Sequence, residues 1–132
     1  MSREIVKQQA LALKRPGATV RTVDEGENVI VILENYTPPG DNYEPARLDA
    51  LAFIVPAPYP EASPDPSGFF VRPASIRVAK TNAEPKNTSQ GNLLGVLHRK
   101  FSWKPKTFQF DGSVDTLETH LTTIERRFLL GT

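Results

Sequence analysis

The 132-residue sequence contains no cysteine. This absence excludes disulfide bonds, thiolate metal sites and catalysis by a cysteine nucleophile. Histidine is also scarce, with His98 and His120 as the only two imidazoles. Two imidazoles are too few for a structural zinc site, and no phosphate-binding loop or catalytic-triad spacing is present. We therefore expect neither a metal nor another cofactor.

Long apolar runs are missing too. The N-terminal residues MSREIVKQQALALKRPG include no stretch long enough for a signal peptide or a membrane span, and no other window approaches that length. We expect a cytoplasmic protein without membrane attachment. The net charge of +1 gives no reason to expect nucleic-acid binding. The length and a hydrophobic fraction of 39% fit one compact domain over residues 1–132.

Acidic and basic residues are segregated along the chain. Residues 24–65 carry nine acidic side chains and one basic one, whereas residues 80–106 carry six basic side chains and one acidic one. Such segregation favours a polarised surface that orients a protein partner. Two solvated loops of opposite sign would give the same pattern.

The sequence contains 12 prolines, which cluster in its middle. Because proline fixes φ and lacks a backbone donor, this region is expected to form turns and extended segments. Apolar and β-branched runs predict strands at residues 19–24, 28–36 and 48–55, and residues 69–78 contain a fourth extended segment that Pro73 interrupts. Residues 81–91 are polar and rich in turn formers, so we expect an exposed, mobile loop there.

Helices are predicted at both ends. Residues 3–14 form a short helix that Pro16-Gly17 ends, with these inner positions: Ile5, Val6, Ala10 and Leu13. The second helix shows one apolar stripe at i, i+4, i+7 and i+11, made by Leu117, Leu121, Ile124 and Phe128. Asp115 and Glu118 have capping-box spacing, with Ser113 as an alternative cap. The order helix, four-stranded antiparallel meander, helix predicts an α+β domain with the helices on one sheet face.

Two sequence motifs narrow the predicted fold further. Residues 53–70, FIVPAPYPEASPDPSGFF, resemble the strand, Pro-x-x-Tyr-Pro turn and second proline typical of the ubiquitin-conjugating superfamily. Trp103-Lys104-Pro105, followed by the helix TLETHLTTIERRF, resembles the Trp-x-Pro that follows the active-site region of that fold. Over about residues 18–130 the chain is similar to the prokaryotic ubiquitin-conjugating-like family E, which occurs beside ubiquitin-like proteins, activating enzymes and JAB-type peptidases. The resemblance implies a ubiquitin-conjugating fold.

The resemblance also implies where a catalyst should lie. In the best-known enzymes of the superfamily a cysteine precedes Trp-x-Pro, and counting back reaches Gly95, within GNLLGVLHR, where no thiol occurs. The His-Pro-Asn tripeptide is absent as well. No serine or alanine at the expected place marks an engineered replacement of a cysteine. The family E pattern instead has a histidine ahead of the tryptophan, which here is His98.

His98 is the candidate general base. Its neighbours Arg99 and Lys100 would lower its pKa, and a neutral imidazole can take a proton from an attacking amine or hydroxyl. A structural histidine bonded to backbone is the alternative. Ser89 and Ser102 are candidate acceptors of an acyl group as an oxyester, but no local carboxylate orients His98 as a base. Turn residues are the alternative for both serines.

A binding surface is predicted in the same segment. Trp103 and Phe101 are candidates for docking a ubiquitin-like protein, with Arg99 and Lys100 as charged neighbours, because aromatic residues are enriched at binding hot spots. Anchoring of the loop on the core is the alternative for Trp103. His120 is expected on the polar side of the last helix, without a role.

Three functions are compatible with the sequence. The first is a cysteine-free, catalytically degenerate conjugating-like protein that binds a ubiquitin-like protein, its activating enzyme or both in a bacterial pathway. The second is an active transferase that works through an oxyester or through direct transfer assisted by His98. The third is a structural scaffold for assembly. The missing thiol favours the first.

Overall fold

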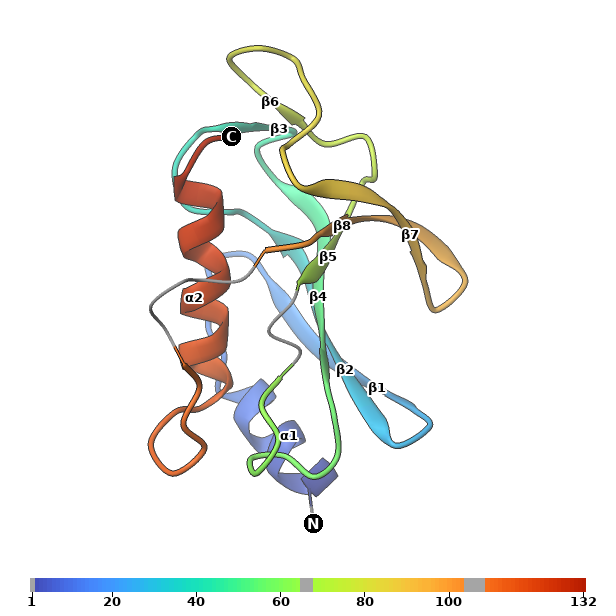
Figure 1. Cartoon of the computed structure of the whole chain (residues 1–132), viewed down its shortest axis with the longest axis vertical. Coiled ribbons are helices and arrows are strands. Elements are labelled where there is room, and N and C mark those ends of the chain that lie inside the picture. Colours follow the sequence, from blue (N-terminus) through green and yellow to red (C-terminus); the bar gives the residue numbers. More distant parts are fainter. Residues whose placement is uncertain (1, 65–67, 104–108) are drawn as a thin grey trace.

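The computed structural model describes residues 2–64, 68–103 and 109–132. The elements in chain order are α1 (Ser2–Leu11), β1 (Thr19–Glu25), β2 (Asn28–Tyr36), β3 (Tyr43–Glu44), β4 (Leu48–Val55), β5 (Phe69–Arg72), β6 (Arg77–Val78), β7 (Thr88–Leu93), β8 (Val96–Phe101) and α2 (Leu117–Leu129). Both helices lie on the same side of the sheet (Figure 1). The predicted α+β class is therefore confirmed. Neither helix in the described residues is long and apolar enough to cross a membrane.

The main sheet has six antiparallel strands in the order β1-β2-β4-β5-β8-β7, and β3 and β6 form a separate antiparallel pair. The predicted four-stranded meander is therefore wrong. The reason is the pair β7–β8, which adds two strands to the four that were expected. Pro73 interrupts residues 69–78 as expected, because β5 ends at Arg72, immediately before the proline, and β6 begins at Arg77.

The loop expected at residues 81–91 ends earlier than predicted. From Thr88 onward the chain forms β7, which pairs with β8 in unbroken register from Thr88↔Phe101 to Leu93↔Val96. Leu94 and Gly95 connect the two strands, with φ of 52° and 75°. Two consecutive positive φ angles are the signature of a type I′ hairpin turn. Asn-Gly or Asp-Gly is the usual sequence there, so Leu-Gly gives little warning of a hairpin.

Leu94 offers a direct test of that turn. A left-handed conformation costs a residue with a Cβ about 1–2 kcal/mol, and asparagine tolerates it better than leucine. We expect Leu94→Asn to raise the free energy of unfolding by about 1 kcal/mol. Gly95→Ala is the matched variant and should lower the free energy of unfolding. Its added Cβ meets no atom within 4 Å, so the cost comes from the positive φ of 75°, which strains alanine. Urea unfolding of both variants measures the pair, and destabilisation by Leu94→Asn would contradict the turn assignment.

The core between sheet and helices is built around α2. The predicted stripe is confirmed, because all four of its residues are buried: Leu117, Leu121, Ile124 and Phe128. The Phe128 ring lies at the centre, with four other aromatic rings at centroid distances from 5.4 to 6.3 Å: Tyr36, Tyr43, Phe69 and Phe101. These four rings come from β2, β3, β5 and β8, so one side chain joins both sheets to the helix.

Helix α1 ends at Leu11, earlier than predicted. Val6, Ala10 and Leu13 are buried as expected, but Ile5 is exposed. The prediction for Ile5 was wrong because Val6, and not its neighbour, turns toward the core. A short amphipathic helix buries a narrow stripe, and adjacent positions point about 100° apart.

The start of α2 differs from the predicted capping box. The cap is Thr116, whose N–H donates to the Thr119 hydroxyl at 3.1 Å. Asp115 instead accepts the backbone N–H of Asp111 at 2.7 Å. The amide oxygen of Gln9 on α1 accepts the Leu117 N–H at 2.9 Å, so part of the first turn of α2 is capped by the other helix.

A clasp of charged groups ties the N-terminal segment to α2. Arg15 donates to Glu118 at 2.7 Å and to Glu125 at 2.9 Å. The Tyr36 hydroxyl donates to the same Glu125 carboxylate at 2.7 Å. Burial, reinforced by that carboxylate, raises the pKa of Tyr36, so the phenol stays protonated and remains a donor.

Candidate functional site

His98 lies on β8, on the sheet face that points away from the helices. The side chain is only 5% exposed. Its Nδ1 is 2.8 Å from the Val96 carbonyl oxygen, and its ring meets the Phe70 ring edge-on at 6.1 Å. A carbonyl oxygen can only accept, so Nδ1 carries the proton and Nε2 is the basic nitrogen of the neutral ring. The backbone bond fixes one tautomer.

The pKa of His98 is lowered, as the sequence predicted, but for another reason. Burial is the main cause, the Val96 carbonyl opposes it, and the positive charge of Arg72 on β5 adds to the lowering. Neither predicted cause, Arg99 or Lys100, is among the causes of the lowered pKa, and Arg99 lies on the opposite face because successive residues of a strand alternate. His98 is therefore neutral at neutral pH.

This lowered pKa makes the stability of the protein depend on pH. In the unfolded chain, His98 takes up a proton near pH 6.5, the ordinary pKa of histidine. In the folded chain, His98 does so at a lower pH. The free energy of unfolding should therefore be highest above pH 6.5 and fall as the pH drops from there to the folded pKa. We expect His98→Gln to remove this component. Urea unfolding at a series of pH values, with the variant curve subtracted, measures it; parallel curves would contradict the assignment.

Neither candidate serine forms a nucleophile–base pair with His98. Ser102 lies four residues further along the same chain direction, about 13 Å away in an extended strand. Ser89 is opposite Lys100 and Gly91 is opposite His98, so Ser89 and His98 share a face as diagonal neighbours about 7–8 Å apart. Strands β5, β7 and β8 contain no aspartate or glutamate that would orient the imidazole.

The predicted docking surface is only partly at the surface. Phe101 is fully buried and stacks on Phe69 at 4.8 Å, so its prediction as a docking residue is wrong. Arg99 is also buried, where it donates to the Ala74 carbonyl at 3.0 Å and pairs with Glu84 at 3.4 Å. Both residues sit on the core side of β8, a consequence of strand alternation.

Lys100 and Trp103 keep accessible surface. Lys100 is half-buried, with its Nζ 5.7 Å from the centre of the Phe70 ring. Trp103 is half-buried. Lys104 and Pro105, which complete the Trp-x-Pro motif, lie outside the described residues. A binding role for Lys100 and Trp103 stays a prediction.

His120 was expected on the polar side of α2, and that placement is wrong. The side chain is buried, and its ring packs edge-on against Phe53 of β4 at 4.8 Å. It lies one position before Leu121 of the apolar stripe, so it borders the core. Burial against an aromatic ring fits a packing role.

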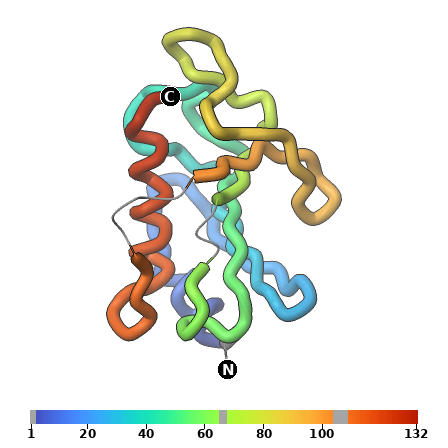
Figure 2. The backbone as a smooth tube through the Cα atoms, viewed as in Figure 1, coloured from blue at the N-terminus to red at the C-terminus, as the bar shows by residue number. Residues whose placement is uncertain are grey.

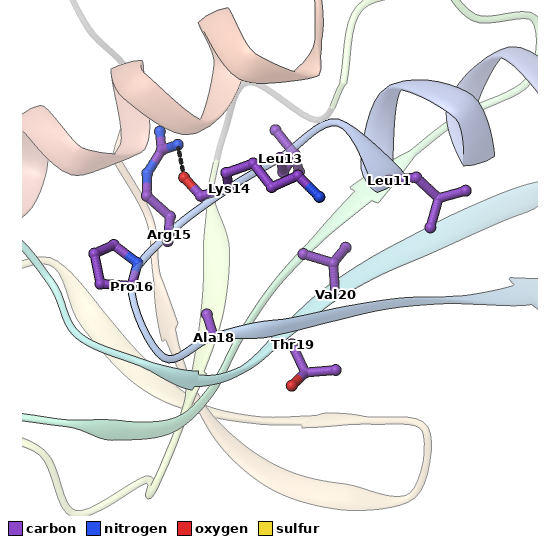
Figure 3. Close-up of a pocket in the computed structure, with 8 residues that line it drawn as sticks. All are labelled: Leu11, Leu13, Lys14, Arg15, Pro16, Ala18, Thr19 and Val20. Atoms are coloured by element: carbon purple, nitrogen blue, oxygen red, sulfur yellow. Dashed lines mark hydrogen bonds between the residues drawn. The ribbon is translucent and has the colours of Figure 1, made fainter.

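A pocket of about 560 Å³ lies between α1 and β1 and is formed by residues 11–20 (Figure 3). Leu13 and Val20 supply apolar surface, and Arg15 turns toward α2, where its charge is already paired. No residue of β8 lines this pocket, so it is separate from His98. In the described part of the chain, no three potential metal ligands gather at one place.

Sequence reasoning missed the apolar tip of the β7–β8 hairpin. Leu94, Val96 and Leu97 are all partly exposed there. The available signal was the run LLGVL, in which a glycine interrupts large aliphatic residues. A hairpin prediction at that glycine would have placed these side chains at a surface turn.

Comparison with known proteins places the chain in a family. The model of the prokaryotic E2 family E matches residues 5–129. Neither a curated protein nor a solved structure matches the chain. The α+β fold with two helices and an antiparallel sheet is consistent with an E2-like fold. Membership supports a ubiquitin-conjugating-like role, with ubiquitin-like proteins and activating enzymes as the general class of partner. Because the match spans nearly the whole chain, the protein belongs to the prokaryotic E2 family E.

Proposed function

We propose that this protein is a catalytically degenerate member of its family, which binds a ubiquitin-like protein, its activating enzyme or both without forming a thioester. The observation that carries this proposal is the complete absence of cysteine from the chain. A thioester needs a thiolate, which no other side chain replaces. The protein matches the family model and has an α+β fold consistent with an E2-like fold, yet lacks that group.

The surroundings of His98 support a binding role over transfer by another nucleophile. A serine hydroxyl is weak unless an oriented base takes its proton. A backbone carbonyl accepts the hydrogen bond from Nδ1 of His98. In a Ser-His-Asp triad, a carboxylate accepts that bond. Ser102 is too distant and Ser89 is only a diagonal neighbour.

Calorimetric titration tests the proposal. A ubiquitin-like protein and an activating enzyme of the class that this family suggests are each titrated into the whole chain. We expect binding to at least one of them. We also expect no covalent adduct when both are present with ATP and magnesium, as judged by intact mass. Absence of binding to either protein would reject the proposal.

One observation favours a transferase as the second candidate function, because Ser89 lies on the same sheet face as His98. An oxyester on Ser89 would survive reducing agent and be cleaved by hydroxylamine. Ser89→Ala would abolish that adduct, whereas the matched change Ser102→Ala would leave it. His98→Gln would slow its formation. Detection of such an adduct would replace the binding proposal with a transferase that uses a hydroxyl.

A further inference from the structure

We propose that the β7 edge and the tip of the β7–β8 hairpin form a docking site for an extended, acidic segment of a partner protein, which adds to the sheet as a further strand and packs aliphatic side chains against the tip. Strand β7 also carries Ser89, but the docking proposal uses the backbone edge of the strand and requires no acyl transfer.

Strand β7 ends the sheet and has a free hydrogen-bonding edge. It pairs with β8 on one side and has no other neighbour in the main sheet. The Ser102 N–H donates to the Asn87 carbonyl at 2.9 Å, which makes Asn87 and Ser102 a hydrogen-bonded pair. In an antiparallel ladder such pairs alternate with pairs whose backbone groups point away. With the observed register, the groups that point away from β8 belong to Thr88, Gln90 and Asn92.

This edge lacks the usual protections against strand addition. Natural edge strands are commonly blunted by proline, by lysine or by a bulge. The sequence of β7, TSQGNL, contains neither residue, and its register with β8 is continuous. The tip of the hairpin also projects away from the rest of the chain (Figure 2). An extended segment therefore meets a straight row of backbone donors and acceptors.

The hairpin tip presents large aliphatic side chains to solvent. Leu94 is 40% exposed, Val96 45% and Leu97 48%. Leu94 also occupies a left-handed backbone position that asparagine or glycine would fill with less strain. Leu94 therefore carries two costs, an apolar side chain exposed to water and a strained backbone conformation. Outliers of this kind concentrate at functional sites, where a partner covers them.

The charge around β7 selects an acidic segment. On the sheet face that Ser89 shares, β5 and β8 carry Arg72 and Lys100, and β5, β7 and β8 contain no acidic residue. Arg99 on the core face is instead paired with Glu84. Lys100 lies opposite Ser89 of β7, and the exposed Lys86 lies two residues before the strand begins. Glutamates or aspartates on an added strand would therefore meet positive charge.

The same charge argues against a second copy as the occupant. A second β7 strand, TSQGNL, contains no acidic residue, so pairing with another copy would bring no carboxylate to Lys86 or Lys100. The other sheet edge differs, because β1 ends in Asp24 and Glu25. Within β1, these two carboxylates outnumber the one basic residue, Arg21, so an acidic segment meets no excess of positive charge on that strand, and β1 serves as an internal control.

The test uses an end-blocked peptide of alternating valine and glutamate, six residues long to match β7. Backbone NMR of the whole chain follows its binding. We expect shift changes at the amides of Gln90 and Asn92, whose hydrogen exchange slows, while the amides of β1 stay unchanged. A valine–lysine peptide of the same length should not bind. A valine–glutamate peptide with N-methyl groups at alternate residues should bind poorly, because its backbone donors are lost.

Three variants separate backbone pairing from folding. Asn92→Pro removes an outward N–H without breaking the ladder to β8, and we expect about tenfold weaker binding of the valine–glutamate peptide. Asn92→Ala keeps that N–H and should bind like the unmodified chain. Leu94→Asn relieves the turn yet should weaken binding by about tenfold through the lost apolar contact.

Each of four results would overturn the proposal. They are no binding of the valine–glutamate peptide, equal binding of the valine–lysine peptide, shift changes centred on β1, and unchanged affinity in Asn92→Pro. Sedimentation of the chain alone adds a fifth, because a concentration-dependent dimer that Asn92→Pro abolishes would assign the β7 edge to a second copy. None of these results bears on binding of the activating enzyme, which calorimetry measures separately.

Discussion

Replacement of Phe128 by alanine is expected to lower the free energy of unfolding by about 3–5 kcal/mol. The ring is fully buried and touches four aromatic rings, which come from both sheets. Truncation loses the transfer free energy of the ring and leaves a cavity. The rigid rings that surround the cavity cannot collapse into it, so relaxation recovers little of the loss.

Urea unfolding, followed by circular dichroism, measures the effect of Phe128→Ala. Leu129→Ala is the matched control, because the adjacent leucine lies on the same helix and is 58% exposed. We expect the control to change the free energy of unfolding by no more than about 0.5 kcal/mol. Equal effects at the two positions would show that Phe128 does not hold the helix on the sheet.

The second large effect is expected for Arg127→Ala, at about 3 kcal/mol of destabilisation. The guanidinium is 1% exposed and donates to the Tyr43 hydroxyl at 2.7 Å, the Lys86 carbonyl at 2.8 Å and the Thr132 carbonyl at 2.8 Å. It also lies 5.0 Å from the centre of the Phe101 ring. Alanine would remove the Arg127 donor from all three oxygens, of which the Thr132 carbonyl keeps the Tyr43 hydroxyl as a donor, and would open a cavity beside the ring.

Two further variants separate the contributions of charge, volume and hydrogen bonding to this loss of stability. Arg126→Ala removes a neighbouring but exposed positive charge, and should cost no more than about 0.5 kcal/mol. Arg127→Met fills most of the volume without donating hydrogen bonds. If hydrogen bonding dominates, methionine and alanine should destabilise the protein by similar amounts. An Arg127→Ala effect no larger than that of Arg126→Ala would refute the role given to the buried guanidinium.

Periodicity predicted those parts of the fold that are encoded locally. The stripe of α2 repeats with the helical period, and the β-branched run of β2 has no competing interpretation, so both were found. The hairpin β7–β8 was missed, because its strands are polar and short and its turn uses leucine where asparagine is usual. The stability of such strands comes from long-range pairing with β5, which sequence patterns do not report.

The candidate site shows the same limit. Adjacency in sequence suggested that His98, Arg99 and Phe101 act together, but a strand sends alternate residues to opposite faces. The true neighbours of His98 are Phe70 and Arg72, which lie on another strand. Only the residue type was readable from the sequence: a histidine ahead of the tryptophan, in a chain without cysteine.

The clasp at Arg15 also bears on when the chain completes its fold. Arg15 bonds to groups 103 and 110 residues away, and Gln9 bonds to a backbone amide 108 residues away. Contacts of such separation close late, because the entropy of a long loop is lost before they form. On the ribosome, the first helix and hairpin must wait with their apolar faces uncovered until α2 emerges. This domain therefore completes its fold in a single step that requires α2, rather than through separately finished parts.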